Sequence, residues 1–256
     1  MSHCIASWNV NSLRVRRQQV LDWLAERQPA VLGLQELKMP TEEFPVDEFA
    51  AAGYHAAVNG QKTYNGVALL SREPPADFHV DLPGFEDDQR RVIAASYGDL
   101  RVVNLYVPNG QSVGSDKYEY KLRWLDALRD YLAEELHTHR QLLVMGDFNI
   151  APDDRDVHDP EAWRGKVLCS EPERERLREL LALGLEDSFR LFDQPEGVFS
   201  WWDYRNFAFR RKLGLRIDLL LVSAPLAARC IESSVDISPR RLERPSDHAP
   251  VYAVFQ

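Results

Sequence analysis

The chain has 256 residues, 45% of them hydrophobic, and a formal net charge of −9 at pH 7. This length suits a single domain over residues 1–256, and the acidic balance argues against a protein that coats polyanions through bulk electrostatics. The three cysteines, Cys4, Cys169 and Cys230, lie far apart without a CxxC spacing, so neither a disulfide framework nor a thiolate zinc site is indicated.

The N-terminal residues Met1-Ser2-His3-Cys4 do not form a basic region followed by an apolar one. Apolar runs along the chain are shorter than the roughly 18 residues that a membrane span needs. We therefore expect a soluble cytoplasmic protein that is not exported and does not bind a membrane. A monomer is the working expectation.

Short apolar or β-branched runs alternate with amphipathic stretches along the whole chain. The first half predicts a helix that begins near Leu13 and is ended by Pro29, and it predicts strands at Ile5–Trp8, Val31–Gln35, Gly66–Ser71, Val92–Tyr97 and Leu100–Val107. The second half predicts helices at Tyr118–His137 and from a Ser170/Glu173 capping box to Leu183, with strands at Leu142–Asp147, Val198–Trp202, Ile217–Val222, Ile231–Ile237 and Val251–Phe255. Two sheets with helices outside them, a layered α/β sandwich, would cover the apolar faces of both element types.

Four polar clusters directly follow predicted strands, where an α/β scaffold commonly places its active site. They are Trp8-Asn9-Val10-Asn11, Gln35-Glu36, Gly146-Asp147-Phe148-Asn149 and Ser246-Asp247-His248. A single acid after a strand is ordinarily a turn residue or a helix cap, but four clusters together indicate a shared site.

Clustered oxygen ligands without cysteine suit a hard divalent cation, and Mg²⁺ takes only one or two protein carboxylates. Glu36 is the leading candidate ligand and Asp247 is the next. Hydrolysis of a phosphodiester needs an in-line water and stabilisation of charged oxygens, and such a cluster can provide both.

In the GDFN segment, Asp147 and Asn149 are two residues apart. If the backbone stays extended, both side chains point to the same side and can act on one substrate. The carboxylate would orient or deprotonate water and the amide would bind a phosphoryl oxygen. A simple turn is the alternative, since Gly, Asp and Asn all favour turns.

Asp247 and His248 are adjacent, so on a strand their side chains point to opposite sides. A remote acid must therefore orient His248, and Asp218 is the candidate because an unpaired carboxylate in its apolar strand would be costly. A protonated His248 would stabilise charge on a phosphate.

Two segments are candidates for substrate contacts. The segment 104–110 offers the Tyr106 phenol and the Asn109 amide to phosphate oxygens, and the segment 199–205 brings four aromatic residues together with Arg205. The aromatic residues could stack against bases or belong to the core. Arginines also concentrate in the segments 205–216 and 240–244, which could be a basic face or two solvated loops.

Eight motifs resemble, in order and spacing, the exonuclease III type of AP endonuclease within the endonuclease/exonuclease/phosphatase superfamily. They are WNVNSLR, LGLQELK, NGVALLSR, RRVIAASYGDLRVVNLYVPNG, VMGDFNIAP, FSWWDYR, GLRIDLLLVS and RPSDHAPV. The resemblance implies a four-layer α/β sandwich that cuts the phosphodiester 5′ to an abasic site. It also implies possible 3′→5′ exonuclease, 3′-phosphatase and 3′-phosphodiesterase activities on double-stranded DNA with abasic sites or blocked 3′ ends.

The resemblance also implies residue roles. Glu36 resembles the metal ligand, with Asn9 and Asp247 close by, and the ion would be Mg²⁺ with Mn²⁺ as a possible substitute. The residues implied in catalysis are Asp147, Asn149, Asp218, His248 and Tyr106. Those implied in substrate binding are Asn109, Trp201, Leu215, Arg216 and Ile217. Leu215 stands where some members carry tryptophan and Asn11 where some carry aspartate, which leaves pocket size and a second metal open.

Two other functions remain possible from the sequence. Superfamily relatives cleave phosphoinositides, sphingomyelin or unselected duplex DNA with the same chemistry, but the aromatic and basic segments favour a repair endonuclease. A binding module that has lost catalysis is the second alternative. The retained acids and His248 argue against it, since binding alone gains nothing from assembling partly buried charges.

Overall fold

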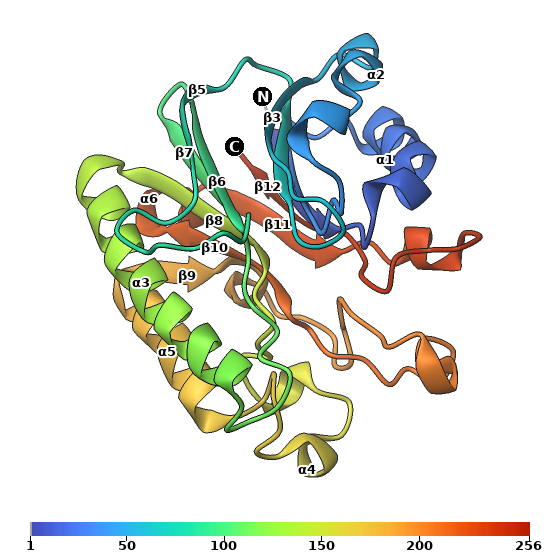
Figure 1. Cartoon of the computed structure of the whole chain (residues 1–256), viewed down its shortest axis with the longest axis vertical. Coiled ribbons are helices and arrows are strands. Elements are labelled where there is room, and N and C mark those ends of the chain that lie inside the picture. The colour runs from blue at the N-terminus through green and yellow to red at the C-terminus, as the bar shows by residue number, and fades with distance from the viewer. Residues whose placement is uncertain (1) are drawn as a thin grey trace.

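The computed structural model describes residues 2–256, which fold into two six-stranded sheets with helices on both outer faces (Figure 1). The strands are β1 (His3–Asn9), β2 (Val31–Gln35), β3 (His55–Asn59), β4 (Val67–Ser71), β5 (Ala76–Val80), β6 (Val92–Tyr97), β7 (Leu100–Tyr106), β8 (Gln141–Asp147), β9 (Leu185–Asp187), β10 (Asp218–Ser223), β11 (Cys230–Val235) and β12 (Val251–Phe255). The α-helices are α1 (Leu13–Arg27), α2 (Val46–Ala51), α3 (Asp116–Thr138), α4 (Pro160–Trp163), α5 (Glu171–Ala182) and α6 (Ala224–Ala227). Within these described residues, no helix is long and apolar enough to cross a membrane.

The two sheets have the same kind of mixed topology. In the first sheet the strand order is β11-β12-β1-β2-β4-β3, and in the second it is β5-β6-β7-β8-β10-β9. The pairs β1–β2 and β7–β8 are parallel, whereas β12 runs antiparallel to β1 and β10 antiparallel to β8. The carboxyl ends of the parallel strands therefore lie at the same edge as the amino ends of β10 and β12.

Three apolar layers separate four layers of secondary structure. The first layer lies between α1 and the first sheet and includes Trp8 and Trp23. The second lies between the two sheets, and the third, which includes Trp124, lies between the second sheet and the pair α3 and α5. Each helix buries one apolar face and each sheet buries both of its faces in this way, which confirms the predicted four-layer α/β sandwich.

Strand β8 explains why a continuous apolar run forms a strand here. Leu142 and Val144 pack toward α3, whereas Leu143 and Met145 pack between the sheets. Alternate side chains of this strand are therefore buried on opposite faces, which requires apolar residues at every position. Gly146 follows with φ +149°, and a Cβ there would lie 1.9 Å from the carbonyl oxygen of Leu105.

A buried amide joins the two sheets. The side chain of Asn104, on β7, donates to the carbonyl oxygens of Leu34 at 3.0 Å and Ala68 at 2.9 Å, and it accepts from Gln35 at 2.6 Å. Gly33 leaves room for this amide, because a Cβ at Gly33 would lie 2.7 Å from its oxygen. These bonds set the position of β2 against β7.

Some predictions of secondary structure are wrong. Val198–Trp202 is not a regular strand, because only Trp201 forms isolated bridges, to Leu215 and to His248. The sequence also missed short or exposed elements that lack a clear apolar period: α2, α4, α6, β3, β5 and β9. Strand β5, for example, is mostly exposed and lies at a sheet edge.

Candidate active site

The candidate site lies where both sheets present strand ends to one another. Asn9 ends β1, Glu36 follows β2, and Asp147 ends β8. His248 precedes β12, and Asp218 opens β10 directly opposite Asp147 in the strand register. Segments from both sheets and from distant parts of the chain therefore meet at one edge, as expected from the sequence.

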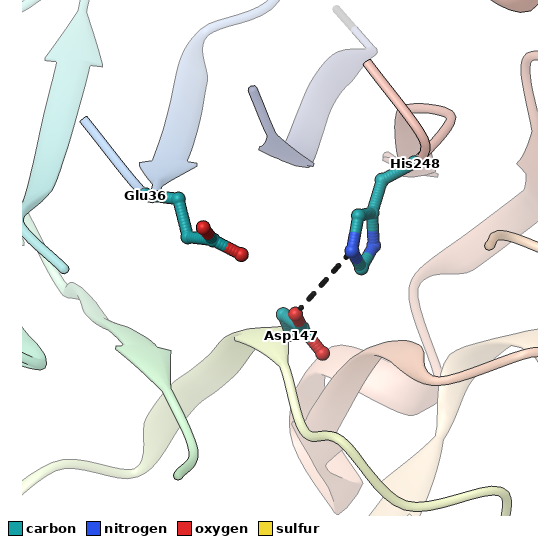
Figure 2. Close-up of side chains that lie close together, drawn as sticks. All are labelled: Glu36, Asp147 and His248. Atoms are coloured by element: carbon teal, nitrogen blue, oxygen red, sulfur yellow. Dashed lines mark ion pairs between the residues drawn. The ribbon is translucent and has the colours of Figure 1, made fainter. Parts of the chain in front are cut away.

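Glu36, Asp147 and His248 are directed toward a common space (Figure 2). Each offers one ligand atom, and these atoms all lie within 4.8 Å of one another. Asn9 is buried between the two acids, and its side-chain nitrogen donates to Glu36 at 3.0 Å and to Asp147 at 2.9 Å. The Tyr106 hydroxyl donates to the same oxygen of Glu36 at 3.0 Å.

Asp218 holds His248, as predicted from its position in an apolar strand. Nδ1 of His248 lies 2.9 Å from Asp218 Oδ2, and Nε2 lies 3.6 Å from Asp147 Oδ2. The Ser200 hydroxyl also donates to Asp218 at 2.6 Å. The histidine therefore connects two buried carboxylates, with Nε2 on the side of Asp147 and Glu36.

The two central groups have strongly shifted pKa values. Burial raises the pKa of Asp147 to about 7, with His248 opposing the rise and Asp218 adding to it. Burial alone would lower the pKa of His248, but Asp218 and Asp147 outweigh this effect and raise that pKa to about 10. Near neutral pH the site therefore combines a protonated imidazole with a carboxylate that can gain or lose a proton.

Asn149 is close to Asp147, but not because the backbone is extended. Asn149 has φ 49°, and its backbone N–H donates to Asp147 Oδ1 at 2.9 Å. Its side chain accepts from Asn109 at 3.1 Å and donates to the carbonyl oxygen of Val107 at 2.9 Å. The assumption of an extended GDFN segment was wrong, because the chain turns immediately after β8.

Asp247 lies outside the group formed by Glu36, Asp147 and His248. Its carboxylate accepts from Asn11 at 2.9 Å and from the Trp201 indole at 3.0 Å. A basic side chain that the sequence analysis missed, Lys38, lies 2.9 Å from Glu36 and also bonds to Asn11. Its position in LGLQELK, two residues after Glu36, was the available signal.

The candidate substrate residues separate into partly exposed and buried ones. Trp201 is partly exposed, whereas Leu215 and Ile217 are buried in the apolar cluster against which it packs. Arg216, which was predicted to contact the substrate, is buried instead. Its guanidinium is only 1% exposed and is paired with Asp156 at 2.6 Å and Asp187 at 2.7 Å.

The predicted basic face is smaller than the sequence suggested. Arg240 is buried against the rings of Trp202, Tyr204 and Phe209. Six cations remain exposed on the segments 204–213 and 240–244: Arg205, Arg210, Arg211, Lys212, Arg241 and Arg244. The two segments that carry these six residues are called the basic loops below. The first of them is the orange loop with a short helix in Figure 1.

This chain is similar over nearly its whole length to known nucleases. Residues 6–248 match the model of the Endonuclease/Exonuclease/phosphatase family. Exodeoxyribonuclease III of Haemophilus influenzae is 39% identical over 98% of each chain, and DNA repair nuclease APEX1 of Danio rerio is 31% identical over 96% of this chain and 80% of its own.

Solved structures give equally complete matches. The structure of the 3′ phosphatase NExo from Neisseria bound to a product DNA hairpin matches with a TM-score of 0.98 and 48% identity, covering 99% of each chain. An AP endonuclease from Archaeoglobus fulgidus matches with a TM-score of 0.95 and 39% identity, again over 99% of each chain. This chain therefore belongs to the endonuclease/exonuclease/phosphatase family, as a member of the exonuclease III type.

Proposed function

We propose that this protein is a metal-dependent DNA-repair nuclease that hydrolyses the phosphodiester 5′ to an abasic site. It would also act at DNA 3′ ends, as a 3′→5′ exonuclease and as a 3′-phosphatase or 3′-phosphodiesterase. The names of its relatives support this range, since they include an exodeoxyribonuclease, a 3′ phosphatase and an AP endonuclease. We expect a cytoplasmic monomer that acts on double-stranded DNA.

The observation that carries the proposal is the placement of His248 Nε2 3.6 Å from Asp147 Oδ2, beside Glu36. Asp147, with a pKa of about 7, is suited to accept a proton from the attacking water. His248, held by Asp218, would donate a hydrogen bond to a phosphate oxygen as negative charge develops there.

Neutral groups would complete phosphate binding. The side-chain amides of Asn149 and Asn109 are bonded to one another, and the Tyr106 hydroxyl lies at Glu36. Burial and the Glu36 carboxylate raise the pKa of Tyr106 well above its ordinary range, so the phenol stays a neutral donor. We propose that these groups orient the scissile phosphate against the water at Asp147.

The residues present fit a hard divalent cation. The Glu36 side chain is 17% exposed, so part of its carboxylate faces the open side of the site. We propose Glu36 as the main ligand of Mg²⁺, or of Mn²⁺ as a substitute, with Asp247 as a further oxygen donor. Asn9 would add its side-chain oxygen once the amide turns, because its nitrogen now faces Glu36 and Asp147. A bound cation would stabilise negative charge on the phosphate and on the departing oxygen.

For recognition of DNA, we propose that Trp201, backed by Leu215 and Ile217, contacts the sugar at the damaged position. The exposed cations of the basic loops follow Trp201 in the chain, in the segment 205–212, and precede Asp247, at Arg241 and Arg244. Cations of this kind bind phosphates without reading sequence. This placement favours DNA over the phosphoinositide or sphingomyelin substrates of other superfamily members.

An incision assay tests the proposed function. The substrates are a duplex with one abasic analogue, an intact duplex, a duplex with a 3′-phosphate and an inositol phosphate, each with Mg²⁺ or with a chelator. We expect cleavage 5′ to the abasic site and removal of the 3′-phosphate, both only with metal. Preferred cleavage of the inositol phosphate would contradict a DNA substrate, and cleavage in chelator would contradict metal dependence.

A further inference from the structure

A fully buried lysine lies directly behind the candidate site. Lys121, on α3, is 0% exposed, and its ammonium group has three partners. It donates to the carbonyl oxygen of Asn149 at 2.6 Å, to that of Asn109 at 3.2 Å, and to Glu173 Oε1 at 2.5 Å. An ammonium group has three N–H donors, so all of them are used.

Two of these partners belong to the loops that carry the candidate phosphate-binding amides. The loop between β7 and α3 contains Asn109, and the turn after β8 contains Asn149. Their side chains meet at 3.1 Å, while Lys121 holds both backbone carbonyls from the opposite side. One cation therefore determines how two loops, 40 residues apart in the chain, face one another.

The contact between Lys121 and Asn149 is linked to the catalytic acid, Asp147. The peptide N–H of Asn149 donates to Asp147 Oδ1 at 2.9 Å, while its carbonyl oxygen accepts from Lys121. A shift of this residue would therefore move both an amide that binds phosphate and the donor that orients Asp147. An error of about 1 Å in such a site can cost on the order of 100-fold in rate.

Packing alone does not explain a charged pair at this position. Both Lys121 and Glu173 are fully buried, and burial lowers the pKa of Lys121 although Glu173 raises it. Replacing a buried ion pair by apolar residues of similar volume is often neutral or stabilising. What an apolar pair cannot provide is the set of directed N–H donors to the two carbonyls.

We propose that Lys121 is a positioning residue of the nuclease site, which fixes the Asn109 and Asn149 loops so that their side-chain amides meet the same phosphate. Glu173 completes this arrangement from α5. Its carboxylate also accepts from the backbone N–H groups of Leu168 at 3.0 Å and Ser170 at 3.1 Å. The inference rests on the proposed function, since it assigns these amides to phosphate binding.

The test compares two double variants that each remove one buried ion pair joined to α3. Lys121→Met with Glu173→Gln removes the positioning pair without leaving an unpaired charge. Arg101→Met with Glu135→Gln is the matched control, because this pair is also buried, joins at 2.7 Å, and lies at the other end of both β7 and α3. Thermal unfolding is measured first for both variants. The values of kcat and KM are then measured at a temperature at which each variant is folded.

We expect the Lys121 double variant to lose roughly 10- to 100-fold in kcat/KM, mainly through kcat, as is typical when the support of a reacting group is removed. The control pair should lower the unfolding temperature and leave kcat/KM close to that of the wild type. Lys121→Met alone is the second variant. It removes the ammonium donors to Asn109 and Asn149, while Glu173 keeps its contacts with the backbone N–H groups of Leu168 and Ser170.

An NMR measurement gives a result that does not depend on activity. In protein labelled with ¹⁵N-asparagine, the side-chain NH₂ signals of Asn109 and Asn149 should move in the Lys121 variants and stay in place in the control. Unchanged signals together with wild-type kcat/KM would overturn the inference. Failure of the proposed function has a different outcome: wild-type protein would cleave no DNA substrate, whatever the Lys121 variants do.

Discussion

Asp147 is the residue on which the proposed chemistry depends most directly. We expect Asp147→Asn to lower turnover by about 10³-fold or more, because the variant loses both the proton acceptor and its placement. DNA binding should persist, since a negative charge beside the phosphate is removed. Single-turnover cleavage and equilibrium binding of the same duplex measure the two effects.

The control for this variant is Asp130→Asn. Asp130 lies on the exposed face of α3 with 72% of its side chain accessible, so its neutralisation should change neither quantity. If Asp147→Asn cleaved DNA at the wild-type rate, Asp147 would have no place in the mechanism.

The coupled pair Asp147 and His248 predicts the pH dependence. Asp147 must be ionised to accept a proton, so kcat/KM should rise as pH passes about 7. His248 must be protonated to donate, so kcat/KM should fall as pH passes about 10. Because the two groups interact strongly, the two apparent pKa values of the profile describe the pair and not either residue alone. A pH–rate profile measures both.

Asp218→Asn should move the alkaline limb to lower pH, because Asp218 stabilises the protonated form of His248. An ordinary exposed aspartate has a pKa of about 4. If kcat/KM already rose near that pH, the base would not be a buried Asp147. The pH profile thus tests the burial of the acid and the role of its neighbour separately.

At the scale of elements, the segment before β10 shows how an apparent substrate residue can be structural. Arg216 joins η2 (Asp154–Asp156) to the end of β9 through Asp156 and Asp187. We expect Arg216→Met to lower the free energy of unfolding by about 3–5 kcal/mol, because the buried Asp156 and the partly buried Asp187 both lose a counter-ion. Denaturant unfolding measures this loss.

Arg211→Met provides the comparison on the same segment. Arg211 is exposed, so its replacement should leave stability unchanged and weaken DNA binding. An Arg216 variant with wild-type stability and weaker DNA binding would restore the substrate role that its burial argues against.

For the whole molecule, the net charge of −9 must be reconciled with binding of a polyanion. The basic loops gather six exposed cations on two short segments, although the chain as a whole carries more acids than bases. We expect the DNA affinity of Asp147→Asn protein to fall with salt. Replacing Arg210, Arg211 and Lys212 by Gln should reduce the slope of log K against log salt by about 1 for each phosphate that is no longer neutralised.

Fluorescence anisotropy over a series of salt concentrations measures this slope. An unchanged slope would place the phosphate contacts elsewhere on the molecule. A replacement of two exposed acids on α3, Asp130 and Glu134, by Gln is a control of opposite charge. It should leave the slope nearly unchanged if the basic loops make the contacts.

Local pattern was sufficient for the long elements and for the identity of the central residues. The period of Leu122, Leu125 and Leu128 predicted α3, and the capping box at Ser170 predicted the start of α5. Strand alternation excluded Asp247 as the acid that orients His248, and the cost of an unpaired carboxylate in an apolar strand indicated Asp218, which the structure confirms. The helix period and the capping box depend on near neighbours in the chain, and the resemblance of eight ordered motifs supplied the reaction type.

Only the three-dimensional packing decided which charges are buried and what they touch. Arg216 and the exposed Arg211 are the same residue type in one basic stretch, but Arg216 is buried and pairs with two acids, Asp156 and Asp187. Lys121 carried no local signal, because its partners at Asn109, Asn149 and Glu173 come from other segments. The energy of a buried charge depends on the groups that surround it in space, and the folded sheets bring those groups together from distant positions in the chain.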